Sequence, residues 1–347
     1  MSANPVMTDV ARERSSALPA APAGPDGAAA VKRAGDPQLA EIATELGAAL
    51  ARRMHPDGSA LARPGDSEPA VDATVWSALA LRVSGGPAAP ETLAAAQAIA
   101  RLQSDDGRVS ISPLHPGGYS PTSISVLAWH GVPELAPARK RAIDFLLTHS
   151  GDHFLRDPAS PLGMDTTLAG WPWIDRTFSW AEPTALALLA LAAAGESEHP
   201  RAQMGRAMLI DRQIAGGGWN YGNAEVFGTE LRPAPESTGL VLCALAGHFP
   251  AAKLDASLAY LGKETTALRT PLALGWCSLA MAAWNPRRGE QEAGLALAIR
   301  ETLAREARYG GYETADLALL SVAAQAPAGL LAALASTQQS GRSGRRP

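Results

Sequence analysis

The chain has 347 residues, 46% of them hydrophobic and 18% charged, and its formal net charge is -4. This composition supplies a sizeable core, and the absence of Lys/Arg clusters argues against a nucleic-acid-binding surface. The longest apolar stretch, residues 184–195, is shorter than the ~20 residues that span a bilayer, so we expect a protein that is not membrane-spanning. No signal peptide is visible, which predicts a cytoplasmic location.

Three regions follow one another along the chain. Residues 1–36 are rich in Ala, Pro, Gly and Ser without helical periodicity, which predicts a disordered leader. Residues 37–337 form the predicted domain, and residues 338–347 (QQSGRSGRRP) a disordered basic tail. Within the domain Ala and Leu dominate and β-branched residues are sparse, so the predicted fold class is all-α.

One unit recurs about six times in residues 37–337: a helix, a turn with Gly, a loop, and a very apolar second helix. The second helices are predicted to start at Asp72–Thr74, Ser120–Thr122, Glu182–Thr184, Glu236–Thr238, Thr270–Pro271 and Glu313–Ala315. Ser, Thr, Asp and Glu can accept from unpaired backbone N–H groups at a helix start, where Pro also fits and acids complement the dipole. Helix capping therefore explains each of these acids without any catalytic role.

The two helices of each unit differ in character. First helices, such as residues 141–148, carry charges on one side and apolar residues on the other, as surface helices do. Second helices, such as residues 184–194, are apolar all round and need burial on every side. A repeat of about 50 residues indicates a solenoid or a closed ring. Since solenoid ends are usually polar and the end units here are not, we predict a single (α/α)6 toroid, or barrel, with the apolar helices inside.

The turns carry a family resemblance. Residues 205–219 (GRAMLIDRQIAGGGW) resemble the QW repeat of squalene cyclases, in which an aliphatic stretch precedes QxxxGxW. Degenerate copies stand at Met54 with Gly58, at Gln103 with Gly107, at residues 141–146 and at residues 309–312. Over about residues 39–335 the chain is thus similar to the terpenoid cyclase and prenyltransferase superfamily. The resemblance implies one squalene-hopene cyclase-like toroid with an isoprenoid or other apolar ligand in a central cavity.

The resemblance also implies a catalytic group. In squalene-type cyclases the proton donor belongs to a DxDD motif that opens an inner helix and precedes Thr-Ala. Residues 180–185 (WAEPTA) occupy the matching place, with Glu182 at the position of the acid, while Trp180 and Pro183 replace the flanking Asp residues. The implied activity is acid-initiated, class II-type cyclisation with Glu182 as general acid and Asp175 and Glu236 as alternatives.

No metal or other cofactor is expected. Protein prenyltransferases hold zinc with an Asp, a Cys two residues later and a distant His, but here Val241 and Gly275 stand two residues before Cys243 and Cys277. Neither cysteine belongs to a CxxC pair, and no two histidines have a spacing typical of a metal site. Both cysteines are predicted to be buried free thiols.

Aromatic residues gather in the loops ahead of the third and fourth second helices. Inner-helix starts should face one end of the ring, so these residues would rim a cavity mouth. Aromatic faces can stabilise cations, and apolar surroundings can raise a carboxyl pKa. The alternative is that these loops plug the barrel and bind no ligand. The aromatic residues predicted to bind substrate are Trp171, Trp173, Phe178, Trp180, Trp219, Tyr221 and Phe227.

Two further functions stay open. A non-catalytic toroid could bind a ligand or a protein, and a filled barrel centre would favour it. An α/α-barrel carbohydrate-active enzyme would need an open polar groove with two carboxylates flanking the sugar, whereas an enclosed apolar cavity with an inward carboxyl would favour the cyclase. The expected partner is an apolar small molecule, and the oligomeric state stays open.

Overall fold

The computed structural model describes residues 36–155, 163–265, 267–287 and 289–343, with side chains described up to Ser336. Everything below concerns residues within the unit Gly35–Pro347. The predicted leader lies outside the described residues except for Asp36, whose carboxylate caps the first helix by accepting from the Gln38 and Leu39 backbone N–H groups.

Helices alternate between an inner and an outer set along the chain. The inner helices are α2 (Val71–Gly85), α4 (Pro121–Ala128), α6 (Ala181–Ala194), α8 (Pro235–Leu245), α10 (Pro271–Trp284) and α13 (Thr314–Gln325). The outer helices are α1 (Pro37–Ala51), α3 (Pro90–Ala100), α5 (Ala136–Thr148), α7 (Pro200–Asp211), α9 (Asp255–Glu264) and α11 (Glu290–Ala304). The remaining elements are α12 (Glu306–Tyr309), α14 (Leu330–Ser343), the 3-10 turns Pro133–Leu135 and Ala251–Lys253, and the antiparallel strands β1 (Glu225–Val226) and β2 (Thr229–Glu230).

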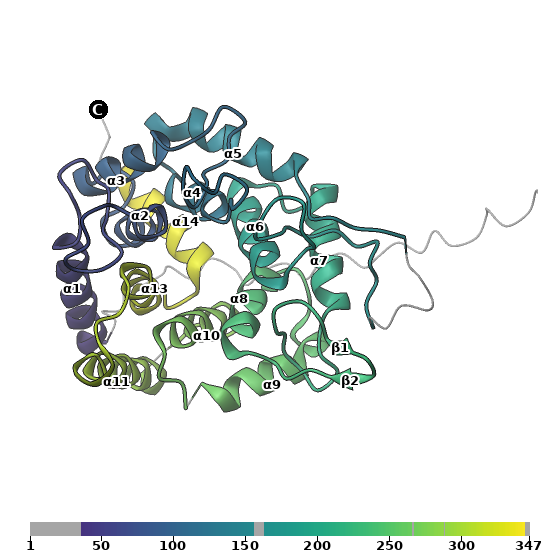
Figure 1. Ribbon diagram of the computed structural model, residues 1–347. Coiled ribbons are helices and arrows are strands. Elements are labelled where there is room, and N and C mark those ends of the chain that lie inside the picture. The colour runs from purple at the N-terminus through teal and green to yellow at the C-terminus, as the bar shows by residue number, and fades with distance from the viewer. Residues whose placement is uncertain (1–35, 156–162, 266, 288, 344–347) are drawn as a thin grey trace, which may run out of the picture. The chain divides into compact units, whose positions relative to one another are not determined.

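The inner helices close into a ring. Each one contacts the next in the order α2, α4, α6, α8, α10, α13, and α13 contacts α2 in turn (Figure 1). The predicted all-α toroid is therefore confirmed. Closure follows from composition, because an inner helix such as α6, with ten buried residues among its fourteen, needs apolar neighbours on every side.

The last helix covers one end of the ring. α14 contacts α2, α6, α10 and α13, and in Figure 1 it lies inside the circle of inner helices. The fully buried Arg82 of α2 donates from Nη2 to the Leu334 carbonyl of α14 and from Nε to the His130 carbonyl. α14 also runs to Ser343, so residues 338–343 are helical, whereas the sequence placed them in the tail. A ligand would reach the ring axis from the other end.

Threonines fasten the inner helices to the loops before them. The Oγ1 atoms of Thr74, Thr122, Thr184 and Thr238 accept hydrogen bonds from the backbone N–H groups of Ala60, Val109, Trp171 and Trp219, each at 2.9 Å. None of the inner helices has a side-chain capping bond at its first residue. The capping prediction was wrong, because each threonine lies inside its helix, at the second or fourth residue, and reaches back to the incoming loop.

Glutamines in the turns tie each unit to the next outer helix. Gln103 donates to the Ala138 carbonyl of α5, and Gln213 donates to Ser257 Oγ of α9. Gly217 has a φ of +100°, and a Cβ there would lie 2.5 Å from the Ala256 carbonyl oxygen. Only glycine fits a left-handed turn pressed so closely against the next helix.

Among the described residues, no individual helix is both long enough and apolar enough to cross a bilayer. Taken together, α13 and Leu330–Ser336, which meet at 71°, reach that length and composition.

Candidate active site

The six inner helices begin at the end of the ring opposite α14, and we call this end the mouth. Acidic residues stand in the first turns of α2, α6, α8 and α13, each of which has at least one. The order of the ring puts α2 beside α13 and α6 beside α8, with α4 between the two pairs on one side and α10 on the other. The acids therefore form two groups on opposite sides of the mouth.

The first group holds two residues that the sequence proposed. The Oγ of Ser237 donates to Glu182 Oε1 at 2.7 Å, which joins the starts of α8 and α6. Burial raises the pKa of Glu182, the hydroxyl of Ser237 opposes that rise, and repulsion from Glu236 adds to it. The structure thus brings Glu182 and Glu236 together, as the sequence predicted for inner-helix starts gathered at one end.

The second group was not proposed as a site. It comprises Asp72 of α2, Asp316 of α13 and Glu313 just before α13. Burial raises the pKa of Asp72 to about 6, repulsion from Glu313 and Asp316 adds to the rise, and a hydrogen bond with Trp76 opposes it. Burial and Glu313 also raise the pKa of Asp316. Only ring closure brings these acids together, although their shared place at helix starts was a usable signal.

The exposed side chain of Arg63 partly neutralises the negative charge of the second group. Its Nη2 atom lies 2.9 Å from Glu313 Oε1, and both side chains are more than half exposed. Asp72 and Asp316 are more enclosed, and burial is the main cause of the raised pKa of each.

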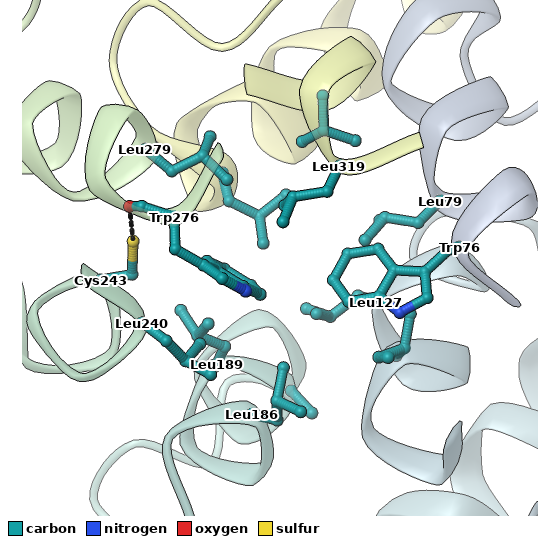
Figure 2. Close-up of a cluster of buried hydrophobic side chains, with 14 of the residues drawn as sticks. Trp76, Leu79, Leu127, Leu186, Leu189, Leu240, Cys243, Trp276, Leu279 and Leu319 are labelled. Atoms are coloured by element: carbon teal, nitrogen blue, oxygen red, sulfur yellow. Dashed lines mark hydrogen bonds between the residues drawn. The ribbon is translucent and has the colours of Figure 1, made fainter. Parts of the chain in front are cut away.

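Below the acids, large apolar side chains fill the ring. The Trp76 and Trp276 rings meet edge to face with centroids 5.8 Å apart, one turn below Asp72 on the α2 side. Side chains from all six inner helices converge on the same place (Figure 2): Trp76, Leu79, Leu127, Leu186, Leu189, Leu240, Cys243, Trp276, Leu279 and Leu319. Sequence reasoning missed both tryptophans, because inside an apolar helix they resemble ordinary core residues.

Two of the predicted cavity-wall tryptophans lie elsewhere. Trp171 and Trp219 are fully buried between the rings, and their Nε1 atoms donate to the Leu146 carbonyl of α5 and the Leu209 carbonyl of α7. The guanidinium of Arg201 covers the Trp171 ring at 3.7 Å. Each indole therefore caps an outer helix.

The other predicted aromatics do not converge either. Phe178 stacks obliquely on Phe154 at 5.7 Å and lies under Arg212. The exposed fractions of Tyr221, Phe227 and Trp173 are 57%, 81% and 36%. Trp180 is half-buried directly before α6 and pairs through its backbone with Trp171. Trp180 lies two residues before Glu182, and the Tyr221 carbonyl accepts from the Ala181 N–H at the same helix start.

Asp175 belongs to a loop contact. Its Oδ2 atom lies 2.9 Å from Arg108 Nη1, and its backbone N–H donates to the Gly117 carbonyl. This ion pair fastens the loop before α6 to the loop before α4. Asp175 therefore has a structural role in this loop contact.

Both cysteines are free and buried, as predicted. Cys277 Sγ donates to the Pro235 carbonyl, and Cys243 Sγ lies 3.9 Å from the Trp276 carbonyl oxygen (Figure 2). Burial raises the pKa of both thiols, which favours the unreactive protonated form.

Several solved structures have the same architecture, and some of them are terpene cyclases. A variant of the type II terpene cyclase MstE from Scytonema, solved with its substrate geranylgeranyl dihydroxybenzoate, superposes with a TM-score of 0.55 at 14% identity, over 86% of this chain and 98% of that chain. The chain has the toroid fold of that cyclase. A protein from Actinoplanes (TM-score 0.51, 15% identity, 86% and 99% coverage) and a glycosidase in complex with glucose (0.50, 12%, 84% and 97%) share it.

No family model and no curated protein sequence matches the chain. At these identities the superpositions establish the fold, and a fold hosts more than one chemistry. Function has to be argued from the mouth and from the ring centre beneath it.

Proposed function

We propose that this protein binds an isoprenoid chain, or a similar apolar ligand, through the mouth of the inner ring and cyclises it after protonating a terminal double bond. The observation that carries the proposal is the position of buried carboxyl groups at the inner-helix starts, directly above a ring centre lined by Leu and Trp. The type II cyclase neighbours that bind such a substrate and its product support it.

The chemistry needs a carboxyl group that holds its proton until the substrate arrives. The carboxyl O–H bond breaks, the π electrons of the alkene form a new C–H bond, and a tertiary cation remains on the adjacent carbon. The next double bond attacks that cation, and loss of a proton or addition of water ends the sequence. Solvent at the mouth then returns a proton to the carboxylate. Trp76 and Trp276 offer aromatic faces to the cation.

Two residues compete for the role of acid. Glu182 has the place that the family resemblance assigns, and Ser237 orients its carboxyl group. Asp72 has the more enclosed carboxyl, lies above Trp76 and is hydrogen-bonded to it. We infer that one of these two is the general acid and that Glu236 and Asp316 act on them through charge.

Incubation with polyprenyl substrates tests the proposal. The protein would be mixed with geranylgeranyl-bearing arenes and free polyprenyl diphosphates, and cyclic isomers would be sought by mass spectrometry. Either Glu182→Gln or Asp72→Asn should abolish product while leaving the circular dichroism spectrum unchanged. Asp175→Asn should retain activity, because Asp175 serves a loop contact. Full activity in both Glu182→Gln and Asp72→Asn would refute an acid at this mouth.

A non-catalytic toroid is the alternative that one observation favours. The Trp76–Trp276 contact and the leucines around it fill the ring centre, as expected of a binding or scaffold role. Mass spectrometry of molecules that co-purify with the protein separates the two: a bound isoprenoid that is never converted favours binding alone. The glycosidase neighbour makes a carbohydrate-active enzyme another alternative. The Leu- and Trp-lined ring centre, however, offers a sugar few hydrogen-bond partners.

We also infer that the turns around Gln103 and Gln213 are QW repeats in the structural sense. The glutamine bonds to the next outer helix and the buried Trp219 support this inference. Their role is to hold neighbouring hairpins together, which leaves catalysis to the mouth.

A further inference from the structure

A groove separates the outer helix α7 from the connection between α8 and α9. Gln203, Arg206 and Ile210 line it from α7, and their spacing puts them on one face of that helix. Phe249 and Lys253 line it from the connection, and its volume is about 400 Å³, within the range of small-molecule sites. Because the connection follows the end of α8, the groove lies away from the helix starts that form the mouth.

Arg206 is a buried cation that opens into this groove. Only 8% of the residue is exposed, and its guanidinium makes no hydrogen bond or ion pair with any residue that the structure describes. In Arg212 of the same region, the Nε and Nη2 atoms are enclosed by protein, whereas Arg206 has no enclosed nitrogen atom. A largely buried charge without a partner is costly. An anion that enters the groove can therefore pair with the accessible guanidinium of Arg206.

Lys253 supplies a second positive charge from the other wall. Its ammonium nitrogen lies 4.6 Å from the centroid of the Phe249 ring, which holds the side chain beside the groove. No carboxylate of the described residues forms an ion pair with Lys253. Two cations from two different elements thus face one groove.

The carboxylate that also lines the groove is already occupied. Asp211 Oδ2 accepts from the Asp165 backbone N–H at 2.9 Å and lies 3.7 Å from Arg212 Nε. The charge of Arg206 acts on His248 instead: burial lowers the pKa of His248, Arg206 lowers it further, and Glu198 opposes the shift. The positive charges of Arg206 and Lys253 therefore face the groove without a carboxylate of their own.

We propose that this groove binds a phosphate monoester. Its phosphate group accepts from the guanidinium of Arg206 and the ammonium of Lys253, since a group with close to two negative charges matches two cations. The groove is larger than a phosphate ion, and the organic part of the ester packs on Ala207, Ile210 and Phe249. The site shares no residue with the mouth of the inner ring, so it does not depend on the cyclase proposal.

Isothermal titration calorimetry of the full chain with phenyl phosphate tests this site, with inorganic phosphate and phenol as the two partial probes. The intact protein should bind phenyl phosphate roughly tenfold more tightly than either, because only the ester uses both the cations and the apolar wall. Its affinity should fall as sodium chloride is added, since salt screens charges near the surface.

Two substitutions at exposed positions test the walls of the groove. Lys253→Gln should weaken phenyl phosphate roughly tenfold, and Lys140→Gln on α5 is its matched control, which should bind normally. Ala207→Glu places a carboxylate in the groove and should abolish binding. Ala40→Glu makes the same change at an exposed position of α1 and should have no effect.

Arg206→Gln should abolish binding of both phosphates. Since Arg206 is largely buried, this variant can fail to fold, and the two substitutions at exposed positions then carry the test alone. Binding of phenyl phosphate no tighter than that of phenol or of inorganic phosphate would overturn the proposal. Unchanged affinity in both Lys253→Gln and Ala207→Glu would overturn it as well.

Discussion

Thr238 and Trp219 exchange two hydrogen bonds. The Trp219 backbone N–H donates to Thr238 Oγ1 at 2.9 Å, and that hydroxyl donates back to the Trp219 carbonyl at 3.1 Å. Thr122 makes the same pair of bonds with Val109. One hydroxyl thus locks the start of an inner helix onto the loop that precedes it, and it holds the carboxyl groups of the mouth in place.

Removing that hydroxyl should destabilise the fold. Thr238→Val keeps the shape of the side chain but leaves the buried Trp219 N–H without its acceptor, so the free energy of unfolding should fall by about 1–3 kcal/mol. Urea denaturation followed by circular dichroism measures the change. Thr238→Ser keeps the hydroxyl and should recover most of the loss. A valine variant as stable as the original would contradict the structural role.

The indole of Trp219 should matter more than the exposed aromatics nearby. Trp219→Ala removes a fully buried side chain and its bond to the Leu209 carbonyl, which should cost about 3–5 kcal/mol of unfolding free energy. Tyr221→Ala, at a residue 57% exposed, should stay within about 0.5 kcal/mol. Similar losses in both variants would show that the loop, and not the indole, carries the stability.

The starts of the inner helices could be predicted from sequence because Pro, Thr and acids mark them. α6 begins at Ala181 and α8 at Pro235, each one residue before the predicted start. What those residues do could not be predicted. A threonine that caps its own helix and one that reaches back to a loop occupy similar sequence positions, and only the path of the loop decides between them.

Gly239 and Gly47 should respond differently to substitution, because only Gly239 lies in a close contact between helices. A Cβ on Gly239 of α8 would lie 2.7 Å from the backbone of α10, at Cys277 N, whereas one on Gly47 of α1 meets open space. Gly239→Ala should therefore destabilise by about 1–3 kcal/mol, and Gly47→Ala should stabilise by about 0.5–1 kcal/mol through helix propensity. Thermal unfolding would measure both, and a harmless Gly239→Ala would contradict the close approach of α8 and α10.

Asp72 should make stability depend on pH. The unfolded chain releases this proton near the ordinary pKa of 3.8, whereas the folded state holds it up to about 6. The folded state therefore binds the extra proton between these values, and the penalty of charging Asp72 grows as the pH rises through that window. Below it the penalty is absent, and above it the penalty is complete.

Asp72→Asn isolates this effect, since asparagine keeps an acceptor oxygen for Trp76. The variant should exceed the original in unfolding free energy by on the order of 1–3 kcal/mol at pH 7.5, and the difference should vanish below about pH 3. Urea titrations at several pH values measure it. A difference that does not vary with pH would show that Asp72 has an ordinary pKa.

The candidate site was only half predictable. Glu182 and Glu236 were expected together because neighbouring units repeat the same helix start. Asp72 and Asp316 are separated by most of the chain, and only closure of α13 onto α2 joins them. Their partner Trp76 has the spacing of a core residue, so periodicity alone does not show that it lies beneath a carboxyl group.

Cyclisation in D2O tests the central claim most directly. A carboxyl group at the mouth exchanges its proton with solvent. The product formed from a polyprenyl substrate should therefore carry one deuterium on that carbon of the terminal double bond which is protonated, next to the carbon that becomes the tertiary cation. Mass spectrometry and deuterium NMR locate it. A product without deuterium at that carbon, or no product from any polyprenyl substrate, would contradict the assignment of an acid-initiated cyclase.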